Sequence, residues 1–383
     1  MHIVIVSPYY APAWTYGGPP KVLSAFAKEF IRKGHTVSVI TTDALDERRN
    51  PVLYEEHKNI RIYRFKLFSN ILAYKTKFFY VPDLFRQTKH ILDTADCVLF
   101  SDVRSILSWQ IFDYLSKKGI RYGVFAFGQI PHGSGWKSWI KKVFDALWVR
   151  RFITNASWCF AQTKHEQDMF HLYFHKKLSD IYLSLLPIDR LRKQGGSSIH
   201  FSQYGINKQD FVVLFVGRFH ILKGVDTLLK ACIPLLYKNS KVKLVLIGRD
   251  DGILDDLRRM VPDDLKKSIL FPGAVYGNTV SLWYKRAQCF AFTPRFYEET
   301  STAALEALSY GCPVVTVPQS DIPFLMEYNA GVIVPNTIPA IRKAVWDVCI
   351  HSTMMEPNAQ KLITDHYNAK KVASRLLSIL QLV

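Results

Sequence analysis

Two stretches of the chain begin with the same order of apolar and polar positions. Each has an apolar run, then apolar positions at helical spacing, then a second apolar run. These segments are residues 3–7, 22–31 and 36–41 in the first stretch and residues 211–216, 228–236 and 243–247 in the second. Continuous apolar runs predict strands buried on both faces, and the spaced positions predict amphipathic helices packed on them. Each stretch therefore predicts the start of a parallel α/β sheet.

Two independent starts predict an α/β fold of two Rossmann-like domains. The length of 383 residues also exceeds what one core usually organises. We expect a first domain at 1–188 and a polar linker at 189–205, which contains the run Gly195-Gly196-Ser197-Ser198. The second domain is expected at 206–362. The pattern of residues 363–383 predicts an amphipathic C-terminal helix. Packing of this helix back on the first domain is one arrangement that the sequence leaves open.

Composition indicates the class of protein and the compartment in which it is expected. Apolar residues make up 49% and charged residues 21%, the balance of a globular chain. Six cysteines lie far apart without a CxxC pair, which argues against zinc sites and disulfides and suits a reducing compartment. The start "MHIVIVSPYY" lacks the features of a signal peptide, and no apolar run reaches roughly 18 residues. We therefore expect a cytoplasmic protein, either free or peripheral at the cytosolic face of a membrane.

A formal net charge of +18 favours an anionic partner: a phosphorylated substrate, an acidic lipid surface or a nucleic acid. The alternative is a basic surface that only keeps the protein soluble. No zinc finger, helix-turn-helix, RRM or KH signature is visible, so we expect no nucleic-acid partner.

The loops after the predicted strands carry the candidate chemistry, because ligands of such sheets bind beyond the carboxyl ends of the strands. Gly17-Gly18 stands before the first helix, whose N-terminus attracts anions. The pair matches neither GxGxxG nor a Walker loop, which disfavours NAD and P-loop chemistry. A plain turn is the alternative. Arg218 and Lys223 flank the corresponding junction of the second stretch, where the two cations predict a diphosphate-binding site.

Glu298 and Glu306 bracket a third junction, in "PRFYEETSTAALEALSYGCPVV" at 294–315. Thr300 or Ser301 is expected to cap a helix that Gly311 terminates. The N–H groups of Thr302 and Ala303 would then face a phosphate, and the two carboxylates would accept hydrogen bonds from sugar hydroxyls. Ordinary helix-surface charge is one alternative. Another is the acid and nucleophile of a retaining glycosidase, which needs two close carboxyl groups and has no use for a phosphate grip.

These motifs resemble those of the GT-B retaining glycosyltransferases commonly called family 4 (glycosyl transferases group 1). The segments that carry the resemblance are Gly17-Gly18 with Lys21, "KGHTVSVIT" at 33–41, "VGRFHILKG" at 216–224, "LVLIGRD" at 244–250, "FPGAV" at 271–275 and "EETSTAALEALSYGCPVV" at 298–315. The resemblance covers nearly the whole chain and is more specific in the C-terminal half. It implies the GT-B arrangement, in which the two Rossmann-like domains face each other across a cleft.

The resemblance implies a role for each matching residue. Gly17 and Gly18 would approach the donor phosphates, and Gly248 would lie at the donor site. Arg218 and Lys223 would neutralise the diphosphate leaving group, while the backbone of Thr302 and Ala303 would meet a phosphate. Glu298 would contact the donor sugar, Glu306 would hold the ribose, and the base would lie near Val275. Arg218, Lys223 and Glu298 are thus the expected catalytic residues.

The active-site His-Gly motif of this family can be aligned with "VFAFGQIPHGSGWKSWIKK" in two registers. His132-Gly133 matches literally, whereas Phe127-Gly128 directly follows the predicted strand 122–126. The second register is favoured, and in it Phe127 stands in place of the histidine. Phe127, Gly128 and His132 are therefore the candidate acceptor-side residues.

Residues 61–90 and 135–152 mix basic and aromatic side chains. On a helical wheel, Trp136, Ile140, Val143, Phe144 and Leu147 share one face, with Lys141, Lys142 and Asp145 roughly opposite. This pattern is typical of a helix lying on an anionic membrane surface, and a helix packed on the core is the alternative.

The sequence thus predicts a retaining hexosyltransferase that moves a sugar from a nucleotide-sugar donor to a saccharide or lipid-linked saccharide acceptor, in polysaccharide or glycolipid synthesis. No DxD-type metal motif is visible, so neither a metal nor another cofactor is expected. A nucleotide-sugar epimerase of the same fold and a catalytically inactive nucleotide-sugar-binding protein are the alternatives.

Overall fold

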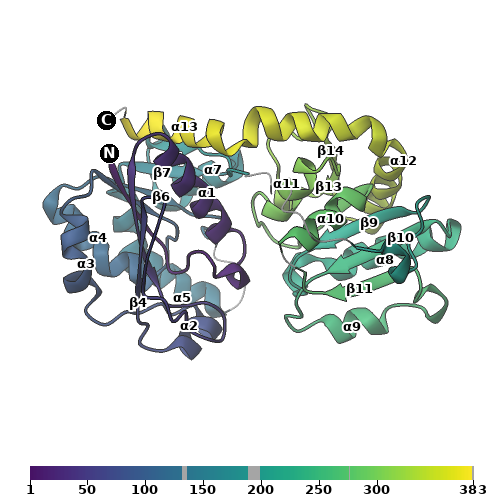
Figure 1. The fold of residues 1–383 in the computed structure, drawn as a ribbon, viewed down its shortest axis with the longest axis horizontal. Coiled ribbons are helices and arrows are strands. Elements are labelled where there is room, and N and C mark those ends of the chain that lie inside the picture. Colours follow the sequence, from purple (N-terminus) through teal and green to yellow (C-terminus); the bar gives the residue numbers. More distant parts are fainter. Residues whose placement is uncertain (132–135, 189–198, 276, 382–383) are drawn as a thin grey trace. The chain divides into compact units, whose positions relative to one another are not determined.

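The computed structural model describes residues 1–131, 136–188, 199–275 and 277–381. The contacts divide the chain into two compact units. The first unit comprises Met1–Pro187 and Ala369–Val383, and the second comprises Ile188–Asn368. Each unit contains one sheet with helices against it (Figure 1).

The first unit is built on an eight-stranded sheet in the order β3-β4-β2-β1-β5-β6-β7-β8. All described neighbours pair in parallel except β3 and β4, which are antiparallel. The strands are β1 (His2–Val6), β2 (Thr36–Thr42), β3 (Tyr54–His57), β4 (Ile60–Phe65), β5 (Cys97–Phe100), β6 (Tyr122–Phe125), β7 (Trp158–Ala161) and β8 (Ile181–Leu183). The helices are α1 (Pro19–Arg32), α2 (Asn70–Thr76), α3 (Leu84–Leu92), α4 (Ile106–Lys118), α5 (Trp136–Phe144), α6 (Arg150–Thr154), α7 (Lys164–Phe174) and α13 (Ala369–Gln381).

Burial explains why the first apolar run forms the centre of this sheet. Ile3, Val4 and Ile5 of β1 are fully buried, as the continuous apolar pattern predicted. α1 buries its apolar stripe, including Phe26 and Phe30. The C-terminal helix α13 contacts α1 and buries Leu376, Leu377 and Leu380, so the end of the described chain completes the first unit.

The second unit has a six-stranded parallel sheet in the order β11-β10-β9-β12-β13-β14. Its strands are β9 (Phe211–Val216), β10 (Val242–Ile247), β11 (Ile269–Gly273), β12 (Cys289–Phe292), β13 (Val314–Thr316) and β14 (Gly331–Ile333). Its helices are α8 (Val225–Lys238), α9 (Leu254–Arg259), α10 (Asn278–Arg286), α11 (Thr302–Ser309) and α12 (Ile338–Leu362). This is the strand order 3-2-1-4-5-6 of the Rossmann fold. β10 and β11 are added on one side of β9, and β12, β13 and β14 on the other, so the topological switch point lies between β9 and β12.

The ends of the second unit differ in detail from the predicted segments. Of the predicted linker 189–205, residues 189–198 lie outside the described residues. Phe201–Tyr204 forms a 3-10 turn whose aromatic rings Phe201 and Tyr204 pack edge-on against Trp283 of α10. Within 363–383, the π-helical turn Ile363–Tyr367 belongs to the second unit, and only the residues from Ala369 belong to the first.

Two glycines allow the strand ends of the second unit to approach each other. A Cβ atom at Gly224 would lie 1.8 Å from the carbonyl oxygen of Thr293, which follows β12. A Cβ atom at Gly248, after β10, would lie 1.8 Å from the carbonyl oxygen of Gly217, after β9. The side chain of Thr293 also donates a 3.1 Å hydrogen bond to the Gly224 carbonyl. The loops after β9, β10 and β12 are therefore held in direct contact.

The contact at Gly224 predicts a large stability difference between two glycine substitutions. Gly205 has almost the same φ, +67° against +65°, but nothing lies within 4 Å of a Cβ there. Gly205→Ala should lower the free energy of unfolding by about 1 kcal/mol through backbone strain alone. Gly224→Ala adds a backbone clash and should cost about 3 kcal/mol or more. Urea unfolding followed by circular dichroism measures both losses, and equal losses would contradict the close approach.

Candidate functional site

The predicted cations and glutamates of the second unit lie in loops at one edge of its sheet. Arg218 and Lys223 follow β9, and Glu298 lies in the loop between β12 and α11. β9 and β12 are the two strands on either side of the topological switch point, and these loops follow their carboxyl ends. Open α/β sheets bind their ligands at this place. The edge between β9 and β12 is therefore the candidate site.

Each of the two predicted cations forms an ion pair with an acidic side chain. Nη1 of Arg218 lies 2.7 Å from Oδ2 of Asp251, which follows β10. The ammonium group of Lys223 donates to the carboxylate of Glu298. The Lys223–Glu298 pair is the more enclosed, because its side chains are 19% and 21% exposed, against 49% and 31% for Arg218 and Asp251. The ammonium also lies 5.6 Å from the centre of the Phe292 ring.

The short helix α11 presents its N-terminus at the same edge. Ser301 caps it, since its hydroxyl accepts a 3.3 Å hydrogen bond from the Ala304 N–H. Thr302 and Ala303 are the first two residues of the helix, so their N–H groups have no acceptor within it. These N–H groups and the helix dipole suit an anionic ligand.

Hydrogen bonds fix the backbone of the loop before α11. The Glu298 N–H donates to the Gln319 carbonyl at 2.9 Å, and the Thr300 hydroxyl donates to the Asp321 carbonyl at 2.9 Å. Glu299 is buried with a left-handed φ of 54°, and its carbonyl accepts a hydrogen bond from Ser320. The loop is therefore held by several contacts to residues 319–321.

Glu306 lies one turn inside α11 and is bound by a residue that sequence reasoning missed. The hydroxyl of Tyr284, on α10, donates a 3.1 Å hydrogen bond to Oε2 of Glu306. Burial raises the pKa of Tyr284 well above its usual range, and the charge of Glu306 adds to the rise. Tyr284 therefore stays protonated and orients the carboxylate. Asp251 was also missed as a site residue; neither partner belongs to a motif, so only the contact itself identifies them.

The remaining donor-side candidates lie at the ends of neighbouring strands. Gly248 follows β10, where its lack of a side chain allows contact with the Gly217 carbonyl. Val275 follows β11 and is partly exposed. Both positions belong to the same carboxyl edge as Arg218 and Lys223, on the side of β10 and β11.

The glycine pair of the first unit offers fewer donors than the sequence suggested. Gly18 caps α1, but the first two helical residues are Pro19 and Pro20, which have no N–H. The next N–H, of Lys21, donates to the Gly18 carbonyl at 3.0 Å. This helix end therefore offers an anion fewer N–H groups than a helix that begins without prolines. Gly17 has a left-handed φ of 99° and is exposed.

Phe127 and Gly128 follow β6 directly, whereas His132 lies outside the described residues. Phe127 has a left-handed φ of 48°, a strained conformation for an aromatic residue, and its ring stacks on Phe125 at 5.4 Å. The Gly128 N–H donates to Oε1 of Glu166 at 2.6 Å, and the other oxygen of this buried carboxylate accepts from the Gln162 N–H. The structure thus fixes a strained turn at this strand end.

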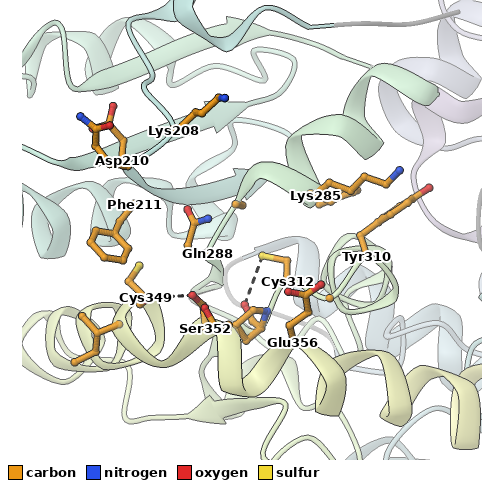
Figure 2. A pocket seen from close by; sticks show the side chains of 17 residues that line it. Lys208, Asp210, Phe211, Lys285, Gln288, Tyr310, Cys312, Cys349, Ser352 and Glu356 are labelled. Carbon is orange, nitrogen blue, oxygen red and sulfur yellow. Dashed lines mark hydrogen bonds between the residues drawn. The ribbon is translucent and has the colours of Figure 1, made fainter.

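A cavity of about 260 Å³ lies elsewhere in the second unit (Figure 2). Phe211, Gln288 and Pro313 line it, and these residues stand at the amino ends of β9, β12 and β13. Its lining contains none of the predicted site residues. It is therefore at the opposite edge of the sheet from the candidate site. Among the described residues, no group of three or more His, Cys, Asp or Glu side chains is arranged to hold a metal ion.

Comparison with known proteins finds a family model that matches most of the second unit. Residues 210–349 match the family described as "Glycosyl transferases group 1". An uncharacterized glycosyltransferase of Methanocaldococcus jannaschii is 34% identical over 125 residues, which are 32% of this chain and 30% of the relative. The alpha-monoglucosyldiacylglycerol synthase of Streptococcus pneumoniae is 30% identical over 115 residues, 30% of this chain and 26% of the relative. These alignments thus span less than a third of either relative.

The whole chain is similar to solved structures. The Anabaena protein HepE, whose crystal structure contains UDP and glucose, superposes with a TM-score of 0.72 at 16% identity, and each chain is covered completely. The chain has the two-domain GT-B fold. The family match concerns residues 210–349, and the structural similarity concerns the fold of the whole chain.

The paired cations of the GT-B site predict diphosphate binding. Arg218→Ala and Lys223→Ala should each weaken the affinity for inorganic diphosphate about tenfold, because each removes a charged hydrogen-bond donor. Isothermal titration calorimetry measures the affinity. Lys238→Ala is the matched control, since Lys238 is exposed at the far end of α8. A control variant that loses as much affinity as the other two would contradict a specific site.

Proposed function

We propose that this chain is a retaining glycosyltransferase that uses a nucleotide-sugar donor and needs no metal ion. The observation that carries the proposal is the grouping of Arg218, Lys223 and the capped N-terminus of α11 at the β9–β12 edge. Two cations and free helix N–H groups are suited to a diphosphate. The family match to residues 210–349 and the UDP and glucose in the similar HepE structure support a nucleotide sugar as its source.

The reaction that fits this site depends on electrostatic stabilisation. The bond between the sugar and the diphosphate breaks, and Arg218, Lys223 and the α11 N–H groups take up the negative charge that develops on the leaving group. The sugar becomes oxocarbenium-like while the acceptor hydroxyl attacks from the same face. A phosphate oxygen takes the proton of that hydroxyl. The positive groups of the protein replace the charge that a metal ion supplies elsewhere.

Glu298 and Glu306 hold the donor in this mechanism and transfer no protons. Glu298 accepts hydrogen bonds from the sugar hydroxyls, and Glu306 accepts them from the ribose. Their partners in the structure are different, Lys223 for Glu298 and Tyr284 for Glu306. This arrangement favours two separate binding roles over the close carboxyl pair of a retaining glycosidase. The base lies beside Val275, next to Gly248.

We assign the acceptor to the first unit and propose a saccharide or lipid-linked saccharide of cell-surface polysaccharide or glycolipid synthesis, to which a hexosyl group is added. The strained turn at Phe127 and Gly128 is the candidate acceptor-side element. The name of the pneumococcal relative, an alpha-monoglucosyldiacylglycerol synthase, supports a lipid-linked acceptor.

Two basic and apolar surfaces of the first unit support a peripheral position on an anionic membrane. The first is the segment 66–80, which contains three lysines and no acidic residue and is closed by a hydrogen bond from the Phe68 N–H to the Tyr80 carbonyl. Its exposed apolar side chains include Phe68 at 66% and Ile71 at 67%. Exposed aromatic and aliphatic groups among lysines suit a surface of acidic lipids. No helix in the described ranges is long and apolar enough to cross a membrane.

The second surface is α5 with the π-helical turn after it, and its exposed face differs from the predicted one. Asp145 is buried and forms an ion pair with Arg104, so the face opposite Val143 and Leu147 packs on the unit and is not an exposed polar face. Phe144 packs on two tryptophans, Trp109 and Trp148, of the first unit. The apolar stripe that remains exposed is Trp139, Val143 and Leu147. The side chains of Trp136 and Ile140 lie outside the description.

If Glu306 binds the ribose, its loss should weaken the binding of a nucleotide sugar but not the binding of diphosphate alone. Glu306→Ala should weaken the affinity for the best-binding nucleotide sugar of a thermal-shift screen about a hundredfold, and Tyr284→Phe about fivefold. Both variants should bind inorganic diphosphate as the wild type does. Calorimetry measures both ligands, and Glu327→Ala, at an exposed acid of the same unit, is the control. Unchanged nucleotide-sugar affinity in Glu306→Ala would contradict the role.

The membrane proposal predicts binding to anionic vesicles. The protein should co-sediment with vesicles containing phosphatidylglycerol and be released by high salt. Phe68→Ser and Trp139→Ser should each lower the partition coefficient about tenfold, since each removes one large apolar group. Leu172→Ser is the control, because Leu172 of α7 is 61% exposed but lies outside both surfaces. Equal binding to vesicles of phosphatidylcholine alone would contradict the role of charge.

A further inference from the structure

Both cations of the candidate site are neutralised by acids of the chain itself. Asp251 pairs with Arg218, and Glu298 pairs with Lys223. A diphosphate that binds Arg218 and Lys223 must therefore compete with two carboxylates. The two acids differ in one respect: Glu298 has a proposed ligand group of its own, the sugar hydroxyls, and Asp251 has none.

The pair Lys223–Glu298 is built so that its side chains can separate while the backbone stays in place. The Glu298 N–H is fixed to the Gln319 carbonyl at 2.9 Å, so only its side chain has to rotate. Lys223 ends the 3-10 turn Ile221–Lys223, directly before the Gly224 that lies against Thr293, and its ammonium lies over the Phe292 ring. The ring keeps a favourable position for the ammonium when the carboxylate leaves.

The nucleotide sugar and the nucleoside diphosphate compensate differently for the loss of the Lys223–Glu298 ion pair. An intact nucleotide sugar gives Lys223 a phosphate and gives Glu298 the sugar hydroxyls, so both charged groups regain partners. A nucleoside diphosphate gives Lys223 a phosphate but leaves Glu298 with neither cation nor hydroxyl. A carboxylate beside a diphosphate is repelled, and this repulsion is strong in a site that is only about a fifth exposed.

We propose that Lys223 and Glu298 form an exchange pair that favours the intact donor over the diphosphate product. This inference rests on the proposed function. When the donor binds, Lys223 exchanges Glu298 for the diphosphate, and Glu298 turns to the sugar. After the sugar has left with the acceptor, Glu298 competes again for Lys223 and weakens the hold on the nucleoside diphosphate. The same contact that prepares the site for the donor thus promotes release of the product.

Replacing the acids by amides tests the exchange. Glu298→Gln keeps the size of the side chain and removes its charge, so inorganic diphosphate should bind about fivefold more tightly than to the wild type. Asp251→Asn should give a gain of about twofold, because its pair is more exposed. Asp255→Asn is the control for net charge, since Asp255 is an exposed acid of α9 that pairs with Arg258. It should leave the affinity unchanged.

A double-mutant cycle ties the gain to the exchange pair. In a Lys223→Ala background, the gain in diphosphate affinity from Glu298→Gln should be clearly smaller, because only the repulsion between carboxylate and diphosphate is then relieved and no competition for Lys223 remains. The ratio of donor to product affinity should fall in Glu298→Gln and stay constant in Asp251→Asn, measured with UDP-glucose and UDP or with the best pair from the nucleotide-sugar screen.

The outcomes separate this inference from the function on which it rests. A wild type that binds diphosphate, with Glu298→Gln binding no more tightly, would overturn the exchange pair alone. An equal gain in Asp255→Asn, or a gain from Glu298→Gln that is just as large without Lys223, would also overturn it. A wild type that does not bind diphosphate at all would overturn the proposed function. Circular dichroism of each variant establishes that the comparison is made between folded proteins.

Discussion

The contact between Gly224 and the Thr293 carbonyl determines the chemistry of the second unit. It joins the loop after β9, which carries the cations, to the loop after β12, which carries Glu298 and leads into α11. These loops are about seventy residues apart in the chain, and only a residue without a side chain at 224 lets them touch. The parallel sheet brings the strand ends to one edge, and the glycine sets how closely their loops meet.

The electrostatics of the site follow from that contact. Lys223 meets Glu298 because their loops are joined, and Arg218 meets Asp251 because Gly248 allows β10 to end against β9. The site is therefore a set of paired charges and not an isolated positive patch. Its affinity for a diphosphate is the difference between new and broken ion pairs, which makes it sensitive to the groups that a ligand offers to the freed carboxylates.

Much of the fold could be predicted because its signals are local. The apolar runs at 3–7 and 211–216 mark the central strands of the two sheets, and the serine at 301 marks the start of α11. The partners of the site could not be predicted in the same way. Asp251 and Tyr284 contact Arg218 and Glu306 across 33 and 22 residues of chain, through side-chain positions that packing decides. The burial of Asp145 was missed because a helical wheel shows which residues share a face but not which face packs on the rest of the unit.

The most direct test of the account is a hydrogen–deuterium exchange measurement with the nucleotide sugar that stabilises the protein most. The account predicts slower exchange at the amides of residues 218–224 and at those of 300–304, where the Thr302 and Ala303 N–H groups meet the phosphate. Protection confined to the opposite edge of the sheet, around the cavity near Gln288 and Cys349, would contradict it.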